Sequence, residues 1–115
     1  MNERAMDHRG ALRAVPLFAA LPEDQLAILA EVAAPIEVAP GRAIARQGEI
    51  GSGLFVILEG RVRVVRNGET VAELGPGESF GELSVLDRRP RLASVVAEER
   101  TRCLAIAAWD AEQLL

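Results

Sequence analysis

The sequence predicts a mainly β domain with a few flanking helices, arranged as an antiparallel sandwich or barrel. Two observations favour this class. Beyond Pro35, short runs of apolar or alternating residues are separated by glycine-containing turns, which is typical of strands. Before that point, apolar residues recur at helical spacing. Because 115 residues suffice for one hydrophobic core and not for two, we expect a single domain.

Two helices are expected ahead of the strands. The helical apolar spacing over 11–32 is interrupted by two prolines. The second, Pro22, fits a first helical position and is followed by two acids that suit a helix N-terminus, so one helix is placed over 22–33. A shorter helix is placed near 10–14. The polar residues 1–9 are expected to form a flexible N-terminal arm.

Short strands are expected from Pro35 onward. They are placed at 36–38, 43–45, 54–58, 61–66, 70–74, 94–97 and 101–107. The dipeptide Asn67-Gly68 is a strong signal for a hairpin between two of them. A final helix is expected to begin at Trp109.

The composition limits the classes of function. A net charge of −4 argues against general attraction to nucleic acid. The single cysteine, Cys103, excludes an internal disulfide and fits a reducing compartment. The sequence contains no apolar run near the ~18 residues that span a bilayer, and its mixed-charge start does not resemble a signal peptide. We therefore expect a cytoplasmic protein with no membrane partner.

Metal-dependent and nucleophilic catalysis are not expected. His8 is the only histidine, which argues against a metal-binding β-barrel enzyme that needs several histidine ligands. The sequence shows no recognisable nucleophile–base pair. We predict no metal, no cofactor and no enzymatic activity.

The segment from Leu74 to Ala97 carries the chemistry of the chain. Glycines 75, 77 and 81 lead into a short apolar turn that is preceded by Glu82 and followed by Arg91. Free N–H groups at the start of a helix attract an anion, and an arginine fork fits two phosphate oxygens. An ionised Glu82 only accepts hydrogen bonds, and a ribose hydroxyl is a suitable donor. The pattern predicts a sugar-phosphate site.

The residues Phe80-Gly81-Glu82-Leu83-Ser84, followed by Pro90-Arg91-Leu92-Ala93-Ser94, resemble the phosphate-binding cassette of cyclic nucleotide-binding domains. The resemblance covers roughly Leu12 to Leu115 and implies a double-stranded antiparallel β-roll. It also implies that Arg91 and cassette amides bind phosphate while Glu82 binds ribose. The ligand-binding residues implied are Gly81, Glu82, Leu83, Ser84, Arg91, Leu92 and Ala93. Val62, Val64 and Val71 would form an apolar wall for the base, although core packing explains them equally well.

Leu92 departs from the family pattern. The family has a small residue after the arginine, alanine in many cAMP binders and threonine or serine in cGMP binders. Leu92 has no hydroxyl for a guanine amino group, which favours cAMP as ligand over cGMP. Its bulk also favours an alternative function, a degenerate β-roll that has lost nucleotide binding and acts as a protein-interaction module.

The resemblance implies a bacterial-type regulatory sensor, similar to the ligand-binding part of transcription regulators. Ligand binding would close the cassette and move the terminal helices, which an output domain or partner would read. The expected domain is 10–115, without the C-terminal helix that covers the base in the family. No direct nucleic-acid contact is expected from this chain. The sequence does not identify the partner, and a homodimer is compatible with it.

Overall fold

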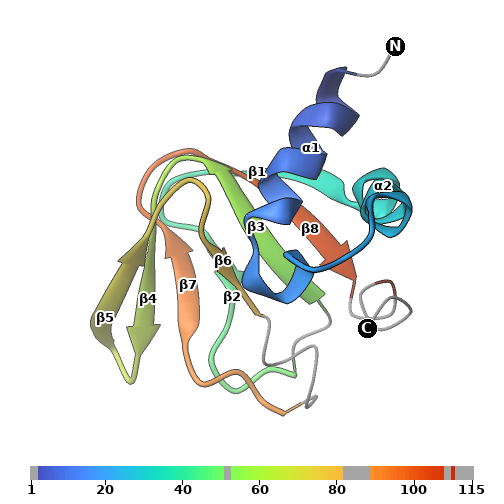
Figure 1. The fold of residues 1–115 in the computed structure, drawn as a ribbon. Coiled ribbons are helices and arrows are strands. Elements are labelled where there is room, and N and C mark those ends of the chain that lie inside the picture. Colours follow the sequence, from blue (N-terminus) through green and yellow to red (C-terminus); the bar gives the residue numbers. More distant parts are fainter. Residues whose placement is uncertain (1–2, 51–52, 82–88, 108–109, 111–115) are drawn as a thin grey trace.

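The computed structural model describes residues 3–50, 53–81, 89–107 and 110 (Figure 1). In chain order, the elements are α1 (Glu3–Arg13), η1 (Pro16–Phe18), α2 (Glu23–Val32), β1 (Ala34–Val38), β2 (Ala43–Ala45), β3 (Gly53–Glu59), β4 (Val62–Arg66), β5 (Glu69–Leu74), β6 (Ser79–Phe80), β7 (Ser94–Ala97) and β8 (Thr101–Ala107). Helices α1, η1 and α2 precede the strands, as the sequence predicts. The helix expected from Trp109 lies outside the described residues except at Asp110, which is helical.

The described strands form two four-stranded antiparallel sheets. One has the order β1-β8-β3-β6 and the other has the order β2-β7-β4-β5. A cluster of buried side chains contains residues from both sheets, so it lies between them. Its buried members are Ala45, Ile57, Val62, Phe80, Val95 and Cys103. The mainly β, antiparallel fold class is therefore confirmed.

A second core lies between β3, β8 and the helices. Leu54 and Val56 of β3 point into it, whereas Ile57 of the same strand points between the sheets. Burial on both faces explains why this strand is a continuous apolar run in the sequence. Figure 1 shows α1 and α2 on the β8 side of the molecule. From the helical segment, the core receives Leu12, Val15, Phe18, Leu26, Leu29, Ala30 and Ala33.

The N-terminal helix is longer than predicted. Helix α1 begins at Glu3, within the segment 1–9 expected to be a flexible arm, and His8 is buried at 8% exposure. The segment has little apolar periodicity, but it contains good helix formers from Glu3 to Met6, and the buried Leu12 anchors the last turn of α1. The Arg13 guanidinium then joins the helices by donating to the carbonyl oxygens of Ala19 and Leu21 at 3.1 and 2.6 Å.

The strand boundaries agree closely with those predicted from the sequence, and two strands show a notable difference. Strand β1 starts at Ala34 and includes Pro35, which is tolerated because β1 lies at the edge of its sheet. Strand β6 has only Ser79 and Phe80, too few residues to produce an alternating pattern. The Asn67-Gly68 turn forms as predicted, with positive φ at both residues.

Candidate ligand-binding site

The backbone of Arg91 is held by the loop that follows β2. Its N–H donates to the Glu49 carbonyl at 2.8 Å, and the Gly48 N–H donates to the Arg91 carbonyl at 2.9 Å. Ile50 and Pro90 form an antiparallel bridge directly beside them. The two segments, far apart in the sequence, therefore form a short ladder that fixes where the Arg91 side chain starts.

The Arg91 guanidinium lies against β3. Its Nη2 donates to the Gly53 carbonyl at 3.0 Å, and its Cζ lies 6.0 Å from the centre of the Phe55 ring. Partial burial lowers the pKa of Arg91, and the charge of Glu49 partly opposes that shift. An arginine stays protonated under such shifts. Within the described part of the chain, no carboxylate forms an ion pair with Arg91.

Gly81 meets Arg91 at the same place. It has a φ of +94°, and a Cβ there would lie 2.7 Å from the Gly53 oxygen and 3.0 Å from Arg91 Nη1. No other residue type fits this backbone and this space. The structure thus brings together Gly81 and Arg91, two of the residues predicted for the phosphate site.

The remaining cassette residues are placed only in part. Glu82, Leu83 and Ser84 lie outside the described residues, and their roles stay predictions. Leu92 is 68% exposed and Ala93 is half-buried.

Ser94 belongs to β7, as expected of a strand residue. Its Oγ accepts a hydrogen bond from the Gln47 N–H at 2.8 Å. The serine therefore anchors the loop that pairs with Arg91.

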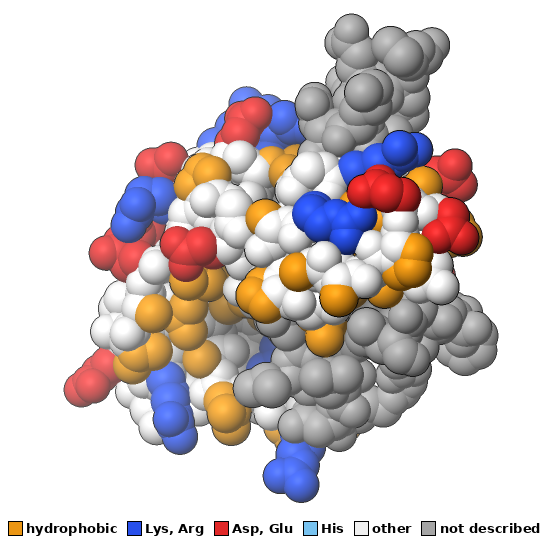
Figure 2. Space-filling view, in the orientation of Figure 1, with side chains coloured by type: hydrophobic (Ala, Val, Ile, Leu, Met, Phe, Trp, Pro, Cys, Tyr) orange, Lys and Arg blue, Asp and Glu red, His pale blue; other side chains and the backbone are white. Residues whose placement is uncertain are grey.

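The three valines predicted for the base wall differ in exposure. Val62 has no exposed surface and belongs to the inter-sheet core, so its place in a base wall stays a prediction. Val64 is half-buried against the same core, and Val71 is 58% exposed. A register shift between β4 and β5 leaves Val71 without a ladder partner. Figure 2 shows hydrophobic side chains gathered on the side where β4 and β5 lie, beside a hollow in the surface.

Sequence reasoning missed three residues at this place. Gly53 supplies the carbonyl that accepts from Arg91, Phe55 lies beside the guanidinium, and Gln47 joins the loop to the β4–β5 hairpin. Gln47 Nε2 donates to Asn67 Oδ1 at 2.8 Å, and the Asn67 N–H donates to Gln47 Oε1 at 2.9 Å. These contacts join distant segments, so no local pattern in the sequence could reveal them.

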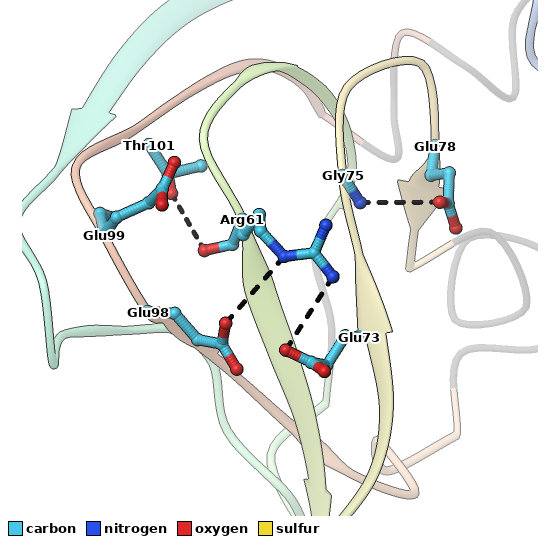
Figure 3. A network of polar contacts seen from close by, with 7 residues as sticks. All are labelled: Arg61, Glu73, Gly75, Glu78, Glu98, Glu99 and Thr101. Carbon is cyan, nitrogen blue, oxygen red and sulfur yellow. Dashed lines mark hydrogen bonds and ion pairs between the residues drawn. The ribbon is translucent and has the colours of Figure 1, made fainter.

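A polar network at the other end of β4 is structural (Figure 3). Arg61 lies between two acids, with Nη2 3.8 Å from Glu73 Oε1 and Nε 4.0 Å from Glu98 Oε2. A hydrogen bond between the Glu73 and Glu98 side chains, burial and the Glu73 charge raise the pKa of Glu98, against the opposing charge of Arg61. Thr101 Oγ1 contacts the Arg61 and Glu99 carbonyls at 3.2 and 2.9 Å. The network closes the β7–β8 turn over the start of β4.

The described residues contain no group of three or more histidine, cysteine, aspartate or glutamate side chains able to hold a metal ion. Of the helices in the described ranges, none is long and apolar enough to cross a membrane.

Comparison with known proteins agrees with this geometry. A family model described as the cyclic nucleotide-binding domain matches residues 35–115. The chain is 44% identical over 75 residues to a cyclic AMP receptor protein of Thermus thermophilus. The aligned region covers 61% of this chain and 35% of that protein. The chain is 39% identical over 97 residues to a cyclic nucleotide-gated potassium channel of Rhizobium etli, covering 84% of this chain and 27% of the channel.

Solved structures show the same fold. The N-terminal domain of a transcriptional regulator from Streptomyces coelicolor superposes with a TM-score of 0.81 at 35% identity, covering 91% of this chain and 76% of that chain. The cAMP-bound PfPKA-R structure superposes with a TM-score of 0.93 at 25% identity, covering 100% of this chain and 43% of that chain.

The fold and site define a β-roll regulatory module. The chain belongs to the cyclic nucleotide-binding domain family, and the resemblance seen in the cassette residues is confirmed. It spans about a third or less of the two curated relatives named above.

Proposed function

We propose that this domain is a cytoplasmic sensor that binds cAMP in preference to cGMP and relays binding through its terminal helices. The observation that carries the proposal is the meeting of Gly81 and Arg91 at the Gly53 carbonyl. Arg91 and the amides of Gly81, Leu83 and Ser84 would bind phosphate, and Glu82 would bind ribose. Leu92 offers no hydroxyl to a guanine amino group, which supports the preference for cAMP.

The chemistry of Arg91 suits a cyclic phosphate. The guanidinium is partly removed from water, which strengthens its hydrogen bonds to an anion. Nη2 donates to Gly53, while the fork has five N–H groups in all. The remaining donors can therefore reach a phosphate without losing the contact that positions the side chain.

Strand β3 offers a route for the relay. Gly53 accepts the hydrogen bond from Arg91 and packs so closely on β8 that a Cβ would lie 2.3 Å from the Ile106 carbonyl oxygen. Ile106 and Leu104 of β8 form one core with both helices. A shift of Arg91 on ligand binding would therefore be passed through β3 and β8 to the helices, where an output domain or partner would read it.

A second candidate function has its own support. Leu92 and Ile50 are 68% and 67% exposed, and both adjoin the short ladder that carries Arg91. Exposed apolar side chains of this size favour a β-roll that binds a protein and not a nucleotide. This is the alternative that the sequence also left open.

Calorimetric titration with cAMP and cGMP separates the two functions. The parent protein should bind cAMP more tightly than cGMP, and Arg91→Ala should lose about 2–5 kcal/mol of binding free energy, the range for truncating a buried charge partner. Arg9→Ala is the matched control, because it removes an exposed arginine from α1 and should bind like the parent. A parent protein that binds neither nucleotide would favour the protein-interaction function.

The ribose contact needs its own test. The 2′-deoxy analogue of cAMP should bind the parent protein more weakly than cAMP, because Glu82 would lose its hydroxyl donor. In Glu82→Ala the two ligands should bind almost equally. Equal discrimination by both proteins would remove Glu82 from the site.

A further inference from the structure

Phe55 contacts both the ring of Phe80 and the guanidinium of Arg91. A residue with a purely structural role in the core would not join an aromatic ring to a cation. Phe55 is a β3 residue whose side chain packs against the inter-sheet core. Its ring stacks on Phe80 with centres 5.1 Å apart and an interplanar angle of 19°. The Arg91 Cζ lies 6.0 Å from the same ring centre. The ring is therefore fixed by Phe80 and contacts the cation of the proposed phosphate site.

The other contacts of Arg91 with described residues do not fix the orientation of its guanidinium. The backbone ladder with Gly48 and Glu49 fixes the start of the side chain, and the Gly53 carbonyl fixes one nitrogen near its end. Among the described residues the guanidinium has one hydrogen-bond acceptor, and a group held by one such bond can still rotate about it. An aromatic face within about 6 Å attracts the cation and restricts the plane of the fork.

An aromatic ring also suits this task better than a carboxylate would. A carboxylate would neutralise the guanidinium and occupy the N–H groups that a phosphate needs. A ring attracts the positive charge through its face and accepts no conventional hydrogen bond. A ring contact therefore uses none of the Arg91 N–H groups that a phosphate needs.

We propose that Phe55 is a positioning residue for phosphate binding, which acts by holding the Arg91 guanidinium in the orientation that the phosphate requires. The inference rests on the proposed function and adds to it a residue outside the cassette. Phe80 would assist indirectly, by fixing the Phe55 ring.

A double-mutant cycle on cAMP binding tests the proposal. Phe55→Leu should weaken binding by about 3- to 30-fold, as expected for a partly desolvated cation–π contact. In an Arg91→Ala background the same change should have almost no further effect, because the group that it positions is absent. Phe55→Tyr keeps the ring and should stay within about twofold of the parent.

Ile57→Val is the matched control for packing. Ile57 lies on the same strand and packs in the same core, and no contact with Arg91 is seen in the described residues. It should bind cAMP like the parent. If Phe55→Leu weakened binding by the same factor with and without Arg91, Phe55 would act on the fold alone and the proposal would fail. Phe55→Met, which fills a similar volume, replaces Phe55→Leu if the leucine variant does not fold.

A nucleotide-free measurement separates this inference from the proposed function. In the NMR spectrum of the free protein, the Arg91 Nε–H resonance should carry a ring-current shift that disappears in Phe55→Leu and persists in Ile57→Val. An unchanged Arg91 resonance in Phe55→Leu would overturn the inference even if the parent binds cAMP. A parent that binds no nucleotide but shows the shift would overturn the proposed function and the role of Phe55 in binding, and would leave only the ring–guanidinium contact established.

Discussion

At Gly81 the backbone conformation and the surrounding space both require glycine. The φ of +94° is rarely adopted by residues with a side chain, and a Cβ would approach the Gly53 carbonyl and the Arg91 guanidinium. Gly77 has a similar φ of +88° but has nothing within 4 Å of the Cβ position. Replacing Gly77 therefore tests the backbone conformation alone, whereas replacing Gly81 tests both the conformation and the close contacts of an added Cβ.

Gly81→Ala should be much more damaging than Gly77→Ala. Both changes should cost about 1–2 kcal/mol of unfolding free energy for the left-handed backbone. Gly81→Ala should also displace Arg91, and should weaken cAMP binding by at least about tenfold. Thermal unfolding and calorimetry on both variants measure the difference. Equal effects on cAMP binding would show that the Gly81–Arg91 approach is not part of the site.

The sequence could suggest the chemistry of the candidate site but not the residues that support it. Gly81 and Arg91 are recognisable because the glycine loop and the Pro-Arg pair are local patterns. Gly53 and Phe55 reach Arg91 only because the sheet places the start of β3 beside the end of the cassette. In the sequence, Val62 and Val64 occupy equivalent positions of an alternating strand. Only the packing of the two sheets shows that Val62 has no exposed surface.

At the scale of elements, Gln47 ties the β4–β5 hairpin to the loop that pairs with Arg91. Its side chain both donates to and accepts from Asn67, which occupies the hairpin turn with a φ of 51°. The hairpin carries Val64 and Val71, and the loop holds the backbone of Arg91. The tether thus fixes the predicted base wall relative to the predicted phosphate site.

Gln47→Ala should loosen this tether at little cost in stability. The contacts are exposed, so we expect a loss of about 0.5–1.5 kcal/mol in unfolding free energy. The Asn67 amide should exchange with solvent faster, because it loses its acceptor, and cAMP binding should weaken. Arg42→Ala, an exposed change just before β2, is the control for hydrogen exchange. An unchanged Asn67 exchange rate would contradict the tether.

Two acids near the turns between strands, Glu37 and Glu98, should contribute to the pH dependence of stability with opposite signs. Hydrogen bonding to Arg100 and its charge lower the pKa of Glu37, so this contact stabilises above the ordinary value of 4.5 and is lost as pH falls through the lowered pKa. The pKa of Glu98 is raised, chiefly by its hydrogen bond to Glu73. Its favourable contribution is therefore present at low pH and is lost as pH rises through the raised pKa.

Glu37→Gln and Glu98→Gln should therefore shift stability in opposite directions at pH 7. Glu37→Gln should be less stable than the parent, and the difference should shrink below about pH 4.5. Glu98→Gln should be more stable than the parent at pH 7, because it removes the repulsion from Glu73, and this difference should also shrink on acidification. Thermal midpoints measured from pH 3 to pH 7 test both signs. Parallel curves for all three proteins would contradict both assignments.

At the scale of the whole molecule, β3 and β8 belong to both cores. They place Leu54, Val56, Leu104 and Ile106 against the helices and Ile57 and Cys103 between the sheets. The sequence predicts strands here but cannot assign their faces, because a strand that is buried on both sides loses its alternation. Unfolding of the two cores should therefore be cooperative, because neither core can open widely without disturbing the other.

Cys103 offers a direct measure of that cooperativity. It is fully buried in β8, opposite Ile36 of β1 on one side and Ile57 of β3 on the other. Burial raises the pKa of its thiol to about 11. At pH 8 the native thiol is therefore about one part in a thousand thiolate, in addition to being shielded from reagents. A thiol reagent should label Cys103 only when the sheet opens.

If that opening is global, it also destroys the nucleotide site, and cAMP must slow the labelling. The native state is stabilised by RT ln(1 + [L]/Kd), so cAMP at 100 times its Kd should slow labelling about 100-fold when opening is fast and reversible. Labelling of Arg91→Ala should respond far less to the same cAMP concentration, and this variant is the control for effects of the nucleotide on the reagent. Labelling that stayed fast in the saturated parent would mean that β8 opens locally. The two cores would then be separable, and the route from Arg91 through β3 and β8 to the helices could not transmit the signal.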